Sequence, residues 1–330
     1  MQIAHLIGDL GFGGAQRQLL LQLTHRANLD VRQQVLTWRD ETGHHGIRSQ
    51  LPEGVRQLHL PKHSRVDPVW LGRLVGHLRD DPPDILHCWL NPASHWGSLA
   101  ARLAGVPALV TSEFVADLPD WRRAVHRLSS AVITDSQAVY RRLPASSRRL
   151  IPPAVEPARE GEIAVLTGRV VLCVGGIHPV KNQLLLVEAL RDTEDHLVLL
   201  GPVRDREYAA QVRALAGGNV TFIDAVQDPR PFFRRADLLV LPSLSESAPN
   251  VVLEAMAYGC SVVASAVGDV PVMLDQGRLG RLVEPGNVRA LRTAIADPIC
   301  GEDGPAWVQK EYSVEAMVGH VESLYSQVLS

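Results

Sequence analysis

The chain has 330 residues, of which 46% are hydrophobic and 21% are charged, and its formal net charge is −3. This length favours two domains, and the composition excludes a large disordered tract. No excess of basic residues supports binding to nucleic acid.

Short apolar runs alternate with longer helical patterns, which is typical of parallel βαβ units. In the first half the helical patterns cover residues 19–27, 69–79 and 95–105. The strands predicted there are Gln2–Ile7, Arg32–Thr37, Ile85–Cys88, Ala108–Thr111 and Ala131–Asp135.

The second half repeats the alternation after a segment rich in proline and glutamate, where we expect the domain linker at 152–162. Helices are predicted over residues 182–190, 208–216 and 249–257. The strands predicted there are Val170–Val174, His196–Leu200, Val220–Ile223, Leu238–Leu241 and Ser261–Ala264. The sequence therefore predicts two doubly wound α/β domains.

The four cysteines are widely scattered, which excludes a zinc site with closely spaced ligands and favours a reducing, cytoplasmic compartment. We find no signal-peptide pattern and no apolar run long enough for a membrane span. Peripheral contact with the inner face of a membrane stays open, because three arginine doublets lie within residues 122–149. Solvated helix faces are the simpler interpretation of these doublets.

Residues 241–264 read as strand, polar loop, helix, glycine and strand. A helix that begins at Pro249 or Asn250 would present free amides, such as those of Asn250 and Val251, as an anion site. Glu246 on the loop and Glu254 in the helix would repel phosphate, so we expect them to accept hydrogen bonds from hydroxyls of a sugar and a ribose. The simpler alternative is a loop cap and a surface residue. The apolar neighbours of Glu254 favour function.

A second loop follows the predicted strand 170–174 and contains Gly175, Gly176 and Lys181. The lysine ammonium is suited to neutralising a diphosphate leaving group. Near the N-terminus, the glycines of GFGGAQ form a tight turn after the first strand, but the spacing is not that of GxGxxG. An NAD-dependent dehydrogenase is therefore disfavoured. A turn that needs only positive φ is an alternative for these glycines.

The segments ESAPNVVLEAMAYGCSVVAS, VGDVP and GRLVEPGN resemble the donor-domain signature of the group 1 glycosyltransferases, which are retaining enzymes of the GT-B fold. The resemblance extends to GFGGAQRQLLLQL, DILHCWL, LAARLAGVPALVTS, IPPAVE and YSVEAMVGHVESLYSQVL. It implies that Glu246 contacts the transferred sugar, Glu254 the ribose and Lys181 the donor phosphates.

The resemblance implies a GT-B architecture of two Rossmann-like doubly wound domains that face each other across a cleft. We expect an acceptor-side domain over residues 1–155 and a donor-binding domain over residues 163–310. Residues 311–330 are expected to form a C-terminal helix that packs back on the N-terminal domain.

Three features depart from the family pattern, and one of them is that IPPAVE lacks the usual asparagine-glycine turn. Gly176 stands where relatives have an arginine that contacts the donor phosphates, so another residue such as His178 or Arg17 would have to substitute, or turnover is impaired. Glu113 stands where many relatives have a histidine near the donor sugar. We assign Glu113 to the sugar site without making it the base.

The predicted site has three parts. The catalytic residues are Lys181, Glu246 and Glu113, and the acceptor-side residues are Arg17, His87 and Trp89. The donor-binding residues are Gly13, Gly14, Gly175, Lys181, Gly201, Val226, Glu246, Asn250, Val251 and Glu254. No D-x-D triplet occurs in the chain, and we expect neither a metal ion nor a cofactor.

The predicted function is transfer of a hexose from a nucleotide diphosphate sugar to the hydroxyl of a glycan or lipid-linked acceptor, in glycan or polysaccharide biosynthesis. Retention of configuration is implied by the resemblance alone. Two alternatives stay open: a GT-B sugar-nucleotide epimerase, and a catalytically weak protein that binds sugar nucleotides.

Overall fold

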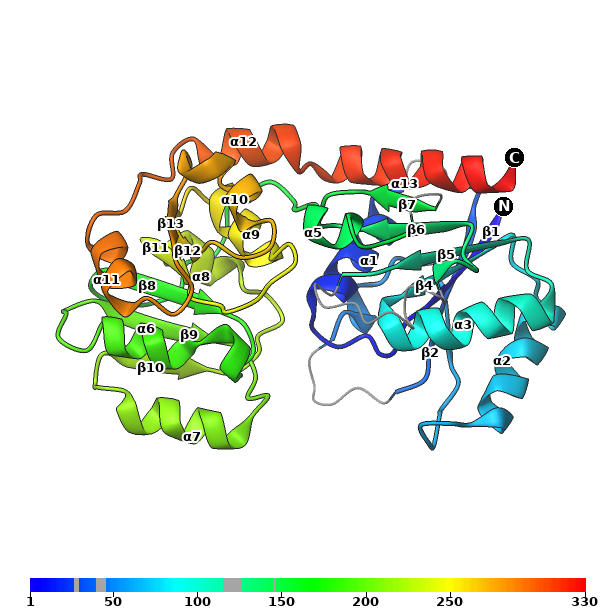
Figure 1. Cartoon of the computed structure of the whole chain (residues 1–330), viewed down its shortest axis with the longest axis horizontal. Helices are drawn as coiled ribbons and strands as arrows, with labels where there is room; N and C mark the ends of the chain where they lie inside the picture. The colour runs from blue at the N-terminus through cyan, green and yellow to red at the C-terminus, as the bar shows by residue number, and fades with distance from the viewer. Residues whose placement is uncertain (27–29, 40–45, 115–125, 145–146) are drawn as a thin grey trace. The chain divides into compact units, whose positions relative to one another are not determined.

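The computed structural model describes residues 1–26, 30–39, 46–114, 126–144 and 147–330 (Figure 1). The chain forms two compact units, one made of Met1–Pro153 with Val314–Ser330 and the other of Ala154–Ser313. Each unit contains one parallel sheet flanked by helices. The predicted α/β class with two doubly wound sheets is confirmed.

The first unit has a seven-stranded sheet in the order β3-β2-β1-β4-β5-β6-β7. Its strands are β1 (Gln2–Leu6), β2 (Arg32–Thr37), β3 (Arg56–His59), β4 (Ile85–Trp89), β5 (Ala108–Ser112), β6 (Ala131–Thr134) and β7 (Arg148–Leu150). Its helices are α1 (Gly14–Thr24), η1 (Arg48–Gln50), α2 (Pro68–Asp80), α3 (Leu90–Ala104), α5 (Gln137–Tyr140) and α13 (Val314–Leu329).

The inner strands β1, β4, β5 and β6 of the first unit are largely buried. Helices α2 and α3 pack on one face of this sheet and α1 on the other. Helix α13 brings the end of the chain onto this unit, beside α1. Its buried residues recur three or four positions apart, which is the spacing of one helix face: Val314, Met317, Val318, Val321, Leu324 and Tyr325. The apolar stripe therefore explains why the last segment folds back onto the first unit.

The second unit has a six-stranded sheet in the order β10-β9-β8-β11-β12-β13. Its strands are β8 (Val170–Val174), β9 (His196–Leu200), β10 (Val220–Ile223), β11 (Leu238–Leu241), β12 (Ser261–Ser265) and β13 (Arg281–Val283). Its helices are η2 (Pro179–Lys181), α6 (Gln183–Ala189), α7 (Arg206–Leu215), α8 (Arg230–Arg235), α9 (Asn250–Ala257), α10 (Val270–Met273), η3 (Asp275–Gly277), α11 (Val288–Ala296) and α12 (Gly304–Glu311).

Successive residues along the strands of the second unit belong alternately to two separate hydrophobic cores, one on each face of the sheet. Leu172 and Leu239 point toward α8, α9, α10 and α12, whereas Val171 and Leu238 point toward α6, α7 and α11. Because both faces are covered, these strands read as continuous apolar runs rather than as alternating ones. Only the connecting loops lie at the carboxyl ends of the strands.

Three short strands were not predicted: β3, β7 and β13. They lie at the edges of the two sheets, and β3 and β7 carry few apolar residues, as in RQLH and RRL. Within the described ranges, no helix is both long enough and apolar enough to span a bilayer.

Candidate functional site

Two loops meet at the carboxyl edge of the second unit's sheet. One follows β8 and leads through η2 into α6, and the other follows β11 and leads into α9. Strands β8 and β11 are hydrogen-bonded neighbours, although β9 follows β8 in the chain and pairs with its other side. This reversal of strand order is the switch point at which ligands of open α/β sheets bind.

Lys181 and Glu246 come from these two loops and form an ion pair. The Lys181 ammonium donates to Glu246 Oε1 at 2.6 Å, and the buried Ser243 hydroxyl donates to the same oxygen at 2.6 Å. The side chains of Lys181 and Glu246 are 29% and 12% exposed, so a ligand can reach both. Among the described residues, no hydrogen bond engages Glu246 Oε2.

Backbone contacts fix the loop that carries Glu246. The Leu244 amide donates to the Val180 carbonyl at 2.8 Å, which ties this loop to η2. Gly268 adopts a φ of +54°, and a Cβ at this position would collide with the carbonyl oxygens of Glu246 and Ser247. Only glycine fits there, so the segment that follows β12 closes directly under the loop.

A glycine contact brings the loop after β8 against the loop after β9. Gly201 adopts a φ of +147°, and a Cβ there would collide with the Gly175 carbonyl. The Gln183 side-chain amide donates to the Gly176 carbonyl at 3.0 Å. The predicted residues Gly175 and Gly201 therefore allow the backbones of the two loops to approach closely at this edge of the sheet.

Helix α9 starts at Asn250 with Pro249 as its N-cap, as the sequence predicted. Asn250, Val251 and Glu254 are half-buried, whereas Val252 and Leu253 are completely buried. Val226 lies in the loop after β10 and packs against the core that contains α9. The first amides of α9 lie at the carboxyl end of β11, where the helix dipole favours an anion.

The structure therefore brings together the predicted donor residues of the second unit after four adjacent strands. The remaining predicted residues lie in the first unit. Gly13 and Gly14 are exposed at the start of α1, and Arg17 lies in the first turns of this helix. Their predicted roles stay predictions.

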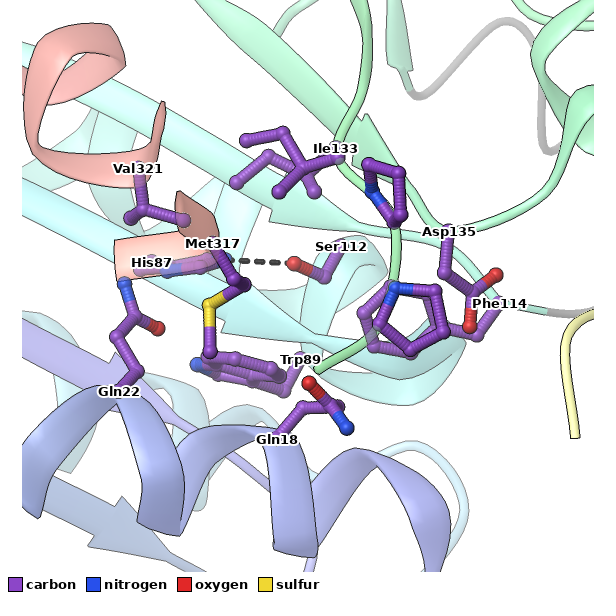
Figure 2. Close-up of a pocket in the computed structure, with 13 residues that line it drawn as sticks. Gln18, Gln22, His87, Trp89, Ser112, Phe114, Ile133, Asp135, Met317 and Val321 are labelled. Atoms are coloured by element: carbon purple, nitrogen blue, oxygen red, sulfur yellow. Dashed lines mark hydrogen bonds between the residues drawn. The ribbon is translucent and has the colours of Figure 1, made fainter. Parts of the chain in front are cut away.

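His87 and Trp89 lie on β4 and line a pocket of the first unit (Figure 2). The His87 ring nitrogens lie 2.6 Å from the Tyr325 hydroxyl and 2.7 Å from the Ser112 hydroxyl. Figure 2 shows the Trp89 ring between Gln18 of α1 and Met317 of α13. The pocket volume is about 20 Å³, room for about one water molecule.

Burial lowers the pKa of His87 well below its usual value, and the nearby His5 lowers it further. His87 is therefore a neutral, hydrogen-bonded core residue that stacks on Trp89 with ring centroids 4.5 Å apart. Its contact with an acceptor stays a prediction, as does that of Trp89.

Glu113 directly follows β5 and is completely buried. Its Oε2 lies 3.4 Å from Nε2 of the buried His126, and its amide donates to the Ile133 carbonyl at 2.9 Å. The predicted contact between Glu113 and a donor sugar stays a prediction.

Ser243 and Gln183 were missed by the sequence reasoning. The Ser243 side chain contacts Glu246, and the Gln183 side chain contacts the Gly176 carbonyl. For Ser243 the sequence did offer a signal, because it is a small polar residue just after a buried strand. The described part of the chain contains no group of three or more histidine, cysteine, aspartate or glutamate side chains arranged to hold a metal ion.

Family models match both halves of the chain. The model for Glycosyl transferases group 1 matches residues 168–299, and the model for Glycosyltransferase Family 4 matches residues 12–159. The chain belongs to the group 1 glycosyltransferase family.

Curated relatives of this family share moderate identity with the chain. The D-inositol 3-phosphate glycosyltransferase of Corynebacterium efficiens is 30% identical over 256 residues, which are 68% of this chain and 57% of that protein. The lipopolysaccharide core biosynthesis mannosyltransferase LpcC of Rhizobium leguminosarum bv. viciae is 30% identical over 200 residues, 54% of this chain and 56% of that protein. The chain spans about half the length of the curated relatives it matches.

Solved structures of other proteins share the fold of this chain. Anabaena Alr3699/HepE, solved in complex with UDP and glucose, matches with a TM-score of 0.82 at 18% identity and covers 99% of this chain and 100% of its own. Sucrose-phosphate synthase from Thermosynechococcus elongatus matches with a TM-score of 0.79 at 22% identity, over 99% of this chain and 98% of its own. The predicted GT-B fold is confirmed.

Proposed function

We propose that the chain is a glycosyltransferase that moves a sugar from a nucleotide diphosphate sugar to an acceptor hydroxyl. The observation that carries this proposal is the 2.6 Å contact between Lys181 Nζ and Glu246 Oε1 at the switch point of the second sheet. It joins a cation suited to diphosphate and a carboxylate suited to sugar hydroxyls in one partly exposed pair. Membership of the group 1 family supports the same reaction.

The diphosphate is bound by the Lys181 ammonium and by the first amides of α9. The helix dipole at the start of α9 stabilises negative charge, and the lysine neutralises the charge that develops on the leaving group. Glu254 lies one helical turn after Asn250 and is half-buried, so it can accept hydrogen bonds from the ribose hydroxyls. UDP complexes of Anabaena Alr3699/HepE support a nucleotide donor for this fold.

Glu246 orients the transferred sugar with one carboxylate oxygen. Lys181 and Ser243 both donate to Oε1, which holds the carboxylate in a single orientation. Oε2 then accepts a hydrogen bond from a hydroxyl of the sugar. The ion pair thus couples binding of the phosphates to placement of the sugar.

In the reaction, the bond between the sugar's anomeric carbon and the diphosphate oxygen breaks, and a bond to the acceptor oxygen forms. The nucleoside diphosphate leaves with the electron pair of the broken bond, and its departing oxygen takes up the proton that the acceptor hydroxyl loses. We propose retention of configuration from the family resemblance, and we propose that the lysine and amides bind the diphosphate without a metal ion or cofactor.

The acceptor is proposed to be a glycan or a lipid-linked intermediate, with the protein in the cytoplasm or in peripheral contact with the inner face of a membrane. The names of the relatives support such acceptors, because they include a lipopolysaccharide core mannosyltransferase. Four free cysteines, three of them buried, support a reducing compartment.

A thermal-shift screen of nucleoside diphosphates and their sugars tests the donor site. We expect one nucleotide to raise the melting temperature by several degrees, since ligand at 100 times Kd stabilises by about 2.7 kcal/mol. Glu254→Ala should abolish this shift, whereas Glu188→Ala, at an exposed glutamate of α6 in the same unit, should keep it. Failure of every nucleotide to shift the wild-type protein would reject the proposal.

A catalytically weak sugar-nucleotide-binding protein is the second candidate, because Gly176 lacks the expected arginine. Mass spectrometry of a reaction with donor and native lipid and glycan extract separates the candidates. Transfer yields a glycosylated acceptor with release of nucleoside diphosphate, whereas tight binding without product favours the second candidate. A changed sugar nucleotide without acceptor would indicate an epimerase.

A further inference from the structure

The space beside Gly176 is filled by another residue's side chain. A Cβ built on Gly176 would lie 2.6 Å from Cγ and 3.6 Å from Nε of Arg204. The Arg204 side chain therefore runs over Gly176, in the space into which a side chain at position 176 would start. A larger residue at position 176 would have to displace it.

The backbone holds Arg204 in this place. The Ile177 amide donates to the Pro202 carbonyl at 2.9 Å, and the Arg204 amide donates to the Ile177 carbonyl at 3.1 Å. Ile177 and Val203 form a parallel β-bridge, which extends the pairing of β8 and β9 beyond the strands. The position of Arg204 beside Gly176 thus follows from the sheet rather than from a free loop.

Two basic side chains reach this edge over two successive glycines. A Cβ on Gly175 would lie 3.6 Å from Cε and 3.9 Å from Nζ of Lys181, as the Cβ on Gly176 would meet Arg204. Arg204 is exposed, and the described residues provide no ion pair or hydrogen bond for its guanidinium. The guanidinium is therefore available to an anionic ligand at the edge where Lys181 lies.

We propose that Arg204 is the second cation of the donor diphosphate site and replaces the arginine that relatives have at the position of Gly176. This inference rests on the proposed function. His178 is less suited to this role, because its ring Nδ1 already accepts a hydrogen bond from the Val180 amide as the cap of η2.

The chemistry of the two cations is complementary. A guanidinium binds phosphate through two parallel hydrogen bonds and fixes its orientation, whereas the Lys181 ammonium acts as a point charge. Arg204 can therefore orient the diphosphate for departure while Lys181 neutralises it. The substitution at Gly176 is then a relocation of the arginine and not its loss.

Calorimetric titration measures Kd for UDP, GDP and ADP and for the matching monophosphates, with four variants. We expect Arg204→Ala to weaken binding of the preferred nucleoside diphosphate by about 10- to 100-fold, the range of a charge-assisted hydrogen bond. The monophosphate should lose less affinity than the diphosphate. Arg204→Lys should restore part of the loss, because it keeps the charge but not the paired hydrogen bonds.

The matched control is Arg191→Ala, which removes the same charge from an exposed position in the turn between α6 and β9, at the other edge of the sheet. It should leave Kd within about twofold of the wild type. The double variant Gly176→Arg with Arg204→Ala moves the guanidinium to the family position and should recover binding relative to Arg204→Ala. Recovery by relocation is a result that a purely structural role of Arg204 would not give.

Equal weakening by Arg204→Ala and Arg191→Ala, or no weakening by Arg204→Ala in a protein that binds the diphosphate, would overturn the inference and leave the proposed function intact. Absence of nucleotide binding in the wild type would instead reject the proposed function. Thermal unfolding of each unliganded variant confirms that the variants are folded.

Discussion

Lys181 and Glu246 touch each other but are proposed to bind different parts of the donor, so their substitutions should have different effects. Lys181→Met keeps the length of the stem and removes the cation, and Glu246→Gln keeps the shape and removes the anion. A nucleoside diphosphate carries no sugar. Its binding should therefore depend on Lys181 and not on Glu246.

The magnitudes follow from the geometry. Lys181 Nζ lies 2.6 Å from Glu246 Oε1 and is 29% exposed, so the pair is partly screened by solvent. Loss of a charge-assisted hydrogen bond costs about 1.5–3 kcal/mol, so Lys181→Met should weaken diphosphate binding by about 10- to 100-fold. Glu246→Gln releases the ammonium from its partner and should leave that binding unchanged or strengthen it.

Turnover of the nucleotide sugar should respond in the opposite way for Glu246. If Oε2 holds the sugar in the transition state, Glu246→Gln should lower kcat by about 100-fold or more, which corresponds to about 3 kcal/mol. Titration calorimetry with the nucleoside diphosphate and product release with the sugar nucleotide are the two assays. Equal loss of diphosphate binding in both variants would refute the division of roles.

Three further predictions concern the scaffold. Gly201→Ala should lower the free energy of unfolding by about 2 kcal/mol or more and weaken diphosphate binding, because the added Cβ would collide with the Gly175 backbone. The control is Gly218→Ala, whose Cβ would have nothing within 4 Å and which should be nearly neutral in denaturant titrations. Tyr325→Phe should destabilise the protein by about 1–3 kcal/mol in the same titrations, because it removes the buried hydroxyl 2.6 Å from His87 Nδ1; a neutral result would contradict the role of that contact. Burial lowers the pKa of His5 to about 3, so between pH 6.5 and 3 this histidine is protonated in the unfolded chain but not in the folded protein. The free energy of unfolding should therefore fall as the pH drops through this range, by up to about 1.4 kcal/mol per pH unit. His5→Gln should reduce this slope in urea titrations at several pH values, and an unchanged slope would count against it.

The sequence predicted the parts of the fold that depend on burial. Strands such as β8 and β11 are covered on both faces and appear as apolar runs, whereas β3 and β7 are the two edge strands of their sheet and carry mostly polar residues. Because parallel strands end at one edge, the sequence could also place Lys181 and Glu246 at the same edge of the sheet.

Individual side-chain contacts could not be predicted from the sequence. The Ser243 hydrogen bond to Glu246 depends on the exact turn of a loop, and the passage of Arg204 over Gly176 depends on the bridge between Ile177 and Val203. His87 was selected from its place at a strand end. Only the fold shows that Tyr325 of α13, 238 positions later, occupies one of its ring nitrogens.

A crystal structure of the protein with its preferred nucleoside diphosphate would show which residues bind the diphosphate. We expect diphosphate oxygens within hydrogen-bond distance of Lys181 Nζ and of the first amides of α9, with the ribose against Glu254. A diphosphate bound away from the loop of Glu246, or a ribose on the far side of the sheet from Glu254, would contradict this expectation.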